Sequence, residues 1–236
     1  MRNRLQGRTA AAMVVALVAV VTLAGFFRVL LPFGATFPFK AALCFAVVGA
    51  IAGSRIDTRN HPFARFGPAN QVTTARAVFV ALIAGAIGEV DEPAIAAAAA
   101  AGAIAVTVMD GVDGWMARRA GMSSAFGARF DMEIDALLIL VLSILAWTFG
   151  KAGAWVILSG LLRYAFVAAG WVWGWMERPL EPSRRRQTIC VVQIIALIAV
   201  IEPFVTQPLS AFIAAIALVV LAGSFVVDTR WLVLQA

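Results

Sequence analysis

The sequence MDGVDGWMARRAGMSSAFGARFDMEID, residues 109–135, concentrates five carboxylates in a chain of 236 residues that has only thirteen acidic residues. Asp110 and Asp113 are three residues apart, and Asp131 and Asp135 are four apart. Each pair therefore shares one face of a helix. Because the polar connection RRAGMSSAFG is short, the segment predicts two antiparallel helices that bring four carboxylates together at one end.

The rest of the chain has the composition of a membrane protein. It is 62% hydrophobic and 14% charged, whereas about a quarter of the residues in a soluble domain are charged. Apolar runs of about 17 to 25 residues, enough to cross a bilayer core, recur along the whole chain. The sequence predicts an all-α, polytopic integral membrane protein with spans at 9–27, 40–54, 72–88, 93–117, 126–149, 152–174, 188–202 and 207–227.

The basic residues indicate how these spans are oriented. Arginines are frequent in alternate connections, within 55–76, 118–129 and 178–186, whereas the other connections contain few basic residues. The positive-inside rule then predicts both chain ends and the acidic segment on the cytoplasmic side of the inner membrane. A net charge of +6 does not indicate nucleic-acid binding, because no surface of interleaved aromatic and basic residues accompanies it.

Four carboxylates held this close repel one another and require a positive partner. His61 is the only histidine, and Cys44 and Cys190 lie in apolar runs without metal-ligand spacing. Oxygen ligands alone favour Mg²⁺, with two ions expected and Mn²⁺ or Ca²⁺ as alternatives. Acidic residues at a helix end can also be solvated interface residues, but two helically spaced pairs flanked by glycines favour a site. A divalent-cation transporter or channel is an alternative from another functional class.

Eight residues share the spacing D-x2-D-G-x2-A-R-x8-G-x3-D-x3-D: Asp110, Asp113, Gly114, Ala117, Arg118, Gly127, Asp131 and Asp135. This pattern resembles the signature of the CDP-alcohol phosphotransferases, integral membrane enzymes of phospholipid synthesis. The resemblance covers the six spans from about residue 70 to 228. It implies a six-helix catalytic membrane domain at 61–236, preceded at 1–60 by a basic segment and two additional transmembrane helices.

The resemblance implies that an alcohol attacks the lipid-bound phosphorus of a CDP-activated donor, usually CDP-diacylglycerol, and releases CMP. Asp110, Asp113 and Asp131 would then be metal ligands, and Asp135 a ligand or the general base. Small residues would leave space for the nucleotide and an arginine would meet a phosphate, at Gly114, Ala117, Gly127 and Arg118. Members of the family tend to form homodimers, so the resemblance also makes a homodimer possible.

The third span begins with NQVTTAR, which is similar to the family's NxxTxxR entry. Asn70, Thr73 and Arg76 are each three residues apart on one helix face. Asparagine and threonine can hydrogen-bond a base or ribose, and an arginine fork suits a diphosphate. The alternative is that Asn70 caps the helix and Arg76 is only a topology signal.

Arginines in the second half of the chain are candidates for binding the acceptor alcohol. Arg163 lies near the middle of an apolar span, where a guanidinium needs a polar environment or an acidic partner. Arg184, Arg185 and Arg186 precede the seventh span and have a topology signal or a lipid contact as their alternative. These arginines favour a phosphorylated acceptor such as glycerol phosphate or inositol phosphate. Ala136 stands where glycerophosphate-using relatives often have lysine, so the acceptor is left open.

Overall fold

The computed structural model describes residues 2–89, 92–120, 122–178, 180 and 183–235, with side chains for all of these except 2–4, 112–120 and 177. Within these ranges the chain is helical and contains no strand. The α-helices are α1 (Arg2–Leu30), α2 (Phe37–Arg55), α3 (Pro68–Gly85), α4 (Pro93–Ala120), α5 (Ala125–Thr148), α6 (Leu158–Val172), α7 (Arg184–Ile201) and α8 (Leu209–Leu234). Two short 3-10 segments are η1 (Ala154–Ile157) and η2 (Gly174–Glu177). The all-α fold with a helix for each predicted span is confirmed.

The described part of the chain contains five segments that are long and apolar enough to cross a membrane: Leu5–Leu30, Phe37–Arg55, Pro93–Gly111, Ala154–Val172 and Leu209–Leu234. The other long helices, α3, α5 and α7, contain arginines or aspartates named above as candidate site residues. These charged residues lower the hydropathy of their helices. The chain is an integral membrane protein whose charged helices carry most of the candidate site.

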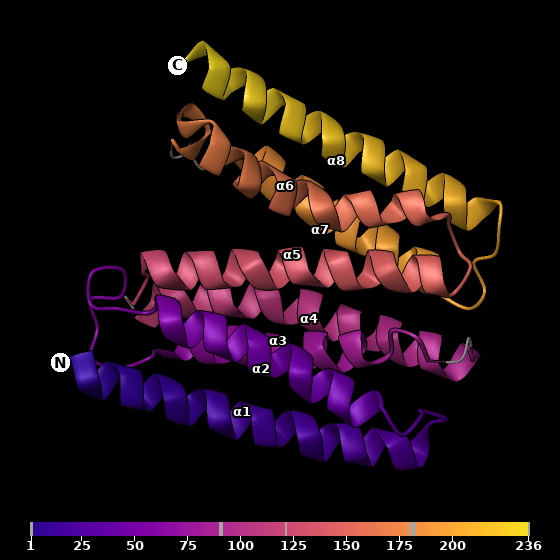
Figure 1. The fold of residues 1–236 in the computed structure, drawn as a ribbon, viewed down its shortest axis with the longest axis horizontal. Coiled ribbons are helices and arrows are strands. Elements are labelled where there is room, and N and C mark those ends of the chain that lie inside the picture. Colours follow the sequence, from indigo (N-terminus) through magenta and orange to yellow (C-terminus); the bar gives the residue numbers. More distant parts are fainter. Residues whose placement is uncertain (1, 90–91, 121, 179, 181–182, 236) are drawn as a thin grey trace. The chain divides into compact units, whose positions relative to one another are not determined.

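The first compact unit extends to Asp135 and contains α1 to α4 and the first turns of α5. Figure 1 shows α1, α2 and α3 running side by side, and both α1 and α2 contact α3. The approach of α2 to α3 is close, because a Cβ atom on Gly85 would lie 2.9 Å from the ring of Phe37. The two N-terminal helices therefore pack directly on the helix that carries Arg76.

An ion pair joins the start of α2 to the segment that follows α3, at the end of this unit opposite the 56–67 connection. Lys40 pairs with Glu89, and its Nζ also donates to the carbonyl of Ile87 at 2.8 Å. The backbone N–H of Gly34, in the α1–α2 connection, donates to the Glu89 carboxylate at 2.6 Å. The connection between the two N-terminal helices is thereby held to α3.

The second compact unit, residues 136–236, contains the rest of α5 and the helices α6 to α8. α7 and α8 pack along one another, and α6 also contacts α8. A side chain at Gly160 of α6 would collide with the backbone of Leu140 in α5, so the glycine permits close packing of these two helices. The Lys151 Nζ donates to the carbonyls of Glu202 and Val205 at 3.0 and 2.9 Å, which fixes the α7–α8 connection.

Candidate active site

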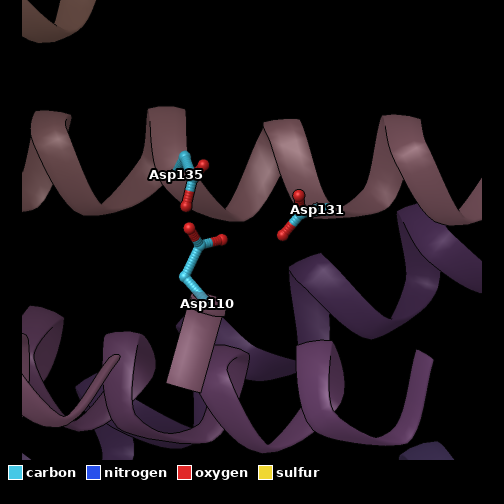
Figure 2. A group of neighbouring side chains, drawn as sticks. All are labelled: Asp110, Asp131 and Asp135. Atoms are coloured by element: carbon cyan, nitrogen blue, oxygen red, sulfur yellow. The ribbon is translucent and has the colours of Figure 1, made fainter. Parts of the chain in front are cut away.

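Three of the predicted carboxylates lie together in the first unit. Asp110 comes from α4, whereas Asp131 and Asp135 come from successive turns of α5. One oxygen from each carboxylate lies within 4.8 Å of the others. Figure 2 shows Asp131 and Asp135 directed from the same face of α5 toward Asp110. The spacing of four residues in α5 therefore has the consequence predicted from the sequence.

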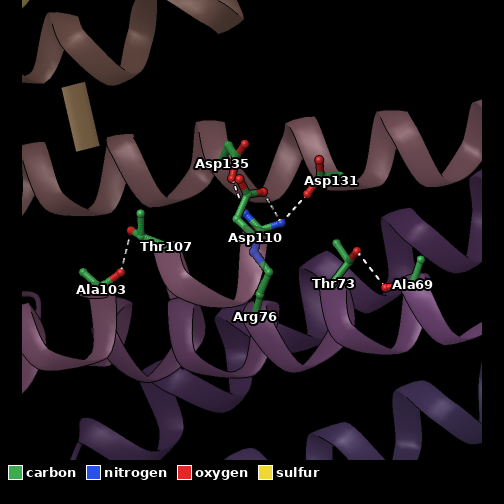
Figure 3. Close-up of polar contacts among 8 residues, drawn as sticks. All are labelled: Ala69, Thr73, Arg76, Ala103, Thr107, Asp110, Asp131 and Asp135. Atoms are coloured by element: carbon green, nitrogen blue, oxygen red, sulfur yellow. Dashed lines mark hydrogen bonds and ion pairs between the residues drawn. The ribbon is translucent and has the colours of Figure 1, made fainter. Parts of the chain in front are cut away.

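Arg76 of α3 supplies a positive charge to this cluster. Its Nη1 lies 2.9 Å from the Asp110 carboxylate, and the guanidinium also forms ion pairs with Asp131 and Asp135 (Figure 3). The Arg76 side chain is 1% exposed, whereas those of Asp110, Asp131 and Asp135 are 34%, 37% and 20% exposed. The arginine is thus buried beneath the carboxylates, which keep an accessible side.

The net charge of this cluster would be balanced by one divalent cation. Three carboxylates and one guanidinium sum to −2, which a single divalent ion would balance. Ligands on opposite sides of an ion bound at about 2.0 to 2.6 Å lie about 4.0 to 5.2 Å apart, so oxygens within 4.8 Å of one another fit such an ion without large movement. The donors are all carboxylate oxygens, the ligands that Mg²⁺ and Mn²⁺ prefer.

Asn70 and Thr73 are buried on α3 together with Arg76. The Asn70 Nδ2 donates to the carbonyl of Phe66 at 2.6 Å, and the Thr73 hydroxyl donates to that of Ala69 at 3.1 Å. The N-cap of α3 is Gly67 and not Asn70, so the alternative that Asn70 caps the helix is wrong. Pro68 opens the helix, because proline has no N–H to leave unpaired in the first turn. A contact between CDP and Asn70 or Thr73 stays a prediction.

Gly127 is required by the close approach of α3. A Cβ atom at this position would lie 2.8 Å from the Asn70 Oδ1 and 3.2 Å from the Ser124 Oγ. The missing side chain therefore makes room for a neighbouring asparagine of α3. The role of Gly127 beside the nucleotide stays a prediction.

The remaining signature positions belong to α4, but their side chains lie outside the described residues: Asp113, Gly114, Ala117 and Arg118. Their predicted roles stay predictions. Glu133 is exposed on α5 and is not among the clustered carboxylates of the described residues.

A second charged cluster lies in the second unit, between α7 and α8. Arg185 forms an ion pair with Asp228, and its Nη1 donates to the Ser224 Oγ at 2.8 Å. Arg186 lies 3.3 Å from the same carboxylate. These arginines were expected before the seventh span, but they form the first turn of α7. The prediction missed this turn because an apolar run ends where charged residues begin.

Arg185, Arg186 and Asp228 line a hollow of about 230 Å³, together with Leu180, Ser183, Val227 and Trp231. Arg184 is exposed and Arg163 is half-buried in α6, and neither lines this hollow. Asp228 was not among the residues predicted for the site. The sequence could have identified Asp228, because an aspartate at the end of an apolar run requires a partner.

The comparison with known proteins agrees with the fold and the carboxylate cluster. A family model described as CDP-alcohol phosphatidyltransferase matches residues 66–226. The match includes α3, the cluster and the arginines of α7, and it begins after α1 and α2. No curated protein and no solved structure matches the chain.

Proposed function

Because the chain belongs to the CDP-alcohol phosphatidyltransferase family, we propose that it transfers a phosphatidyl group from a CDP-activated lipid such as CDP-diacylglycerol to a small polar alcohol. The observation that carries this proposal is the cluster of Asp110, Asp131 and Asp135 over a buried Arg76. In the reaction the alcohol oxygen forms a bond to the lipid-bound phosphorus. The bond from that phosphorus to the bridging diphosphate oxygen breaks, and CMP leaves.

A bound divalent cation, Mg²⁺ first and Mn²⁺ next, would neutralise and orient the diphosphate oxygens, and two such ions are expected once the diphosphate adds its own negative charge. Asp110, Asp131 and Asp135 are the described residues that would hold it, and Asp113 is the predicted fourth ligand. Around CDP the predicted residues are Asn70, Thr73, Arg76, Gly114, Ala117, Arg118 and Gly127.

Asp135 is the proposed general base. Its carboxylate would take the proton from the alcohol hydroxyl while the oxygen attacks. Arg76 contacts both Asp131 and Asp135 from the buried side, which fixes how these carboxylates face the accessible side. Since the Arg76 side chain is 1% exposed, its burial favours this orienting role over the direct contact with diphosphate expected from the sequence.

The hollow beside α7 and α8 is the proposed site for the acceptor. Arg185 and Arg186 contribute two positive charges against the single negative charge of Asp228, and the surplus favours an acceptor that carries phosphate. Glycerol phosphate and inositol phosphate are candidates of that class. Arg163 and Arg184 stay predicted acceptor-binding residues.

The setting of the reaction follows from the charge distribution along the chain. Its arginine-rich connections support a proposed active site on the cytoplasmic side of the inner membrane. Donor and product are then membrane lipids, and the acceptor arrives from the cytoplasm. The same proposal includes assembly of the protein as a homodimer.

The test is CMP release by the purified protein, supplied with CDP-diacylglycerol, Mg²⁺ and a series of candidate alcohols. Asp135→Asn should abolish turnover but leave Mn²⁺ binding largely intact, because Asp110 and Asp131 keep their carboxylates and an amide oxygen can still be a ligand. Glu133→Gln is the matched control, because it neutralises an exposed carboxylate on the same helix, and it should retain activity. Divalent-cation flux across vesicles without CMP release would favour the transporter alternative and contradict the proposal.

A further inference from the structure

His61 is fully buried, although it lies in the connection between α2 and α3. Its Nδ1 lies 2.9 Å from the Ser124 Oγ, in the connection between α4 and α5. Its Nε2 lies 2.8 Å from the carbonyl of Arg65, within its own loop. One imidazole therefore joins the segment that follows α2 to the segment that begins α5, across 63 positions of sequence.

The partners determine the direction of these hydrogen bonds in the uncharged ring. A carbonyl oxygen only accepts, so the Nε2 of His61 carries the hydrogen and donates to Arg65. The Nδ1 is then an acceptor, and the hydroxyl of Ser124 donates to it. The Ser124 Oγ in turn accepts the backbone N–H of Gly127 at 3.0 Å. The imidazole orients the hydroxyl that satisfies the first turn of α5.

Asn60 makes a second contact with the same turn of α5. Its carbonyl accepts the backbone N–H of Phe126 at 3.1 Å. Asn60 is itself held, because its backbone N–H donates to the Asp57 Oδ1 at 3.0 Å and its Nδ2 donates to the carbonyl of Arg55 at 2.6 Å. Arg55 is the last residue of α2. Hydrogen bonds thus lead from the end of α2 to the start of α5.

The first turn of a helix has N–H groups without partners inside the helix, and here segment 57–61 and Ser124 satisfy two of them. Asp131 lies four residues after Gly127, and Asp135 lies eight after it. Both are on the face of α5 that begins at Gly127. A rotation of the first turn would therefore turn both carboxylates away from Asp110.

We propose that His61, together with Asn60, is a positioning residue that holds α5 in the rotation at which Asp131 and Asp135 meet Asp110 and Arg76. Both residues precede the family match. A segment outside that match, after the two additional N-terminal helices, therefore positions the carboxylates of α5. This inference rests on the proposed function for its effect on catalysis. Its effect on α5 and on metal binding is independent of that function.

Two substitutions separate the contact with α5 from the contact within the loop. The amide of His61→Asn ends near the position of the imidazole Nδ1, so it keeps a partner for Ser124. The amide of His61→Gln reaches the position of Nε2, so it keeps only the contact with Arg65. His61→Ala loses both. The proposal predicts that His61→Asn retains function and that His61→Gln behaves like His61→Ala.

Hydrogen–deuterium exchange of the purified protein measures the first step. The backbone amides of Phe126 and Gly127 should exchange about fivefold faster in His61→Gln and His61→Ala than in the wild type, the factor expected for loss of one hydrogen bond. They should exchange at the wild-type rate in His61→Asn. Equal exchange in His61→Gln and His61→Asn would overturn the proposal.

Metal binding measures the second step, with Mn²⁺ alone as the probe and electron paramagnetic resonance as the readout. The Mn²⁺ concentration for half-saturation should rise about fivefold in His61→Gln. Lys40→Met is the control for a general loss of stability, because it breaks the ion pair between the start of α2 and Glu89 in the segment after α3. It should lower the melting temperature and leave Mn²⁺ binding unchanged. An equal loss of Mn²⁺ binding in Lys40→Met would reduce His61 to a structural role and overturn the proposal.

The activity assay distinguishes this inference from the proposed function. If the wild type releases no CMP with any acceptor, while His61→Gln still changes exchange and Mn²⁺ binding, the proposed reaction fails and the positioning role stands. If the wild type is active, His61→Gln should raise the Mg²⁺ concentration for half-maximal CMP release about fivefold. An unchanged Mg²⁺ requirement together with unchanged Mn²⁺ binding would overturn the positioning role alone.

Discussion

The buried guanidinium of Arg76 and the three carboxylates around it stabilise one another's charges. A charge that is 1% exposed in a membrane protein is stable only with partners, and Asp110, Asp131 and Asp135 are those partners. The sequence predicted that a positive charge lies among the carboxylates, and the oxygen ligands favoured a metal ion as that charge. It did not predict that Arg76, 55 positions before Asp131 and 59 before Asp135, would share that role, because no local spacing encodes such a contact.

Arg76→Met should destabilise the protein by about 3 to 5 kcal/mol, since it leaves the partners of a buried ion pair uncompensated. Mg²⁺ should then raise the melting temperature of the variant more than that of the wild type, because the cation replaces the lost positive charge. Thermal unfolding with and without Mg²⁺ measures both effects. Stabilisation by Mg²⁺ equal to that of the wild type would show that Arg76 and the cation do not share these carboxylates.

Gly127→Ala should destabilise the protein by about 1 to 3 kcal/mol, because the added methyl group would overlap the Asn70 Oδ1. The double variant Gly127→Ala, Asn70→Ala should recover part of that loss, since it removes the overlapping group. Gly25→Ala in α1 is the matched control, because a Cβ atom there has no neighbour within 4 Å. Melting temperatures of the purified variants provide the comparison. Failure of the double variant to recover any stability would contradict the steric explanation.

Helices as elements were largely predictable, whereas their ends and tertiary contacts were not. Apolar runs predicted each long helix of the described residues, because a membrane span must satisfy its backbone internally. They placed the start of α7 at residue 188, although the helix begins at Arg184. The link from His61 to Ser124 also escaped prediction, since its partners are 63 positions apart. The convergence of Asp131 and Asp135 was predictable because it depends only on the helical repeat.

The first turn of α7 should determine affinity for the acceptor. Arg186→Gln removes a charge from the hollow that also contains Asp228. It should raise the KM for a phosphorylated acceptor about tenfold, equivalent to ~1.4 kcal/mol, and leave the KM for CDP-diacylglycerol unchanged. Arg178→Gln, at an exposed position after η2, is the control for loss of one basic residue. Equal effects on the two KM values would contradict an acceptor site here.

The whole molecule has a distribution of charge that predicts its orientation. Arg59 is exposed in the connection between α2 and α3, and Thr206 is exposed in that between α7 and α8. With both chain ends in the cytoplasm, these two connections lie on opposite sides of the membrane. In a background without Cys44 and Cys190, a membrane-impermeant maleimide should label Arg59→Cys only in inside-out vesicles and Thr206→Cys only in right-side-out vesicles. Labelling of both variants from the same side would contradict the orientation.

The chemistry of the intact protein can be followed by ³¹P nuclear magnetic resonance in lipid nanodiscs that contain CDP-diacylglycerol and Mg²⁺. With the correct alcohol, the diphosphate signals should disappear while CMP and a new phosphodiester lipid form in equal amounts. Asp110→Asn should abolish both products, because among the described residues Asp110 is the carboxylate that α4 adds to the cluster. Unchanged formation of both products by Asp110→Asn would contradict phosphatidyl transfer at the carboxylate cluster. An unchanged diphosphate signal with every alcohol tested on the wild type would contradict it as well.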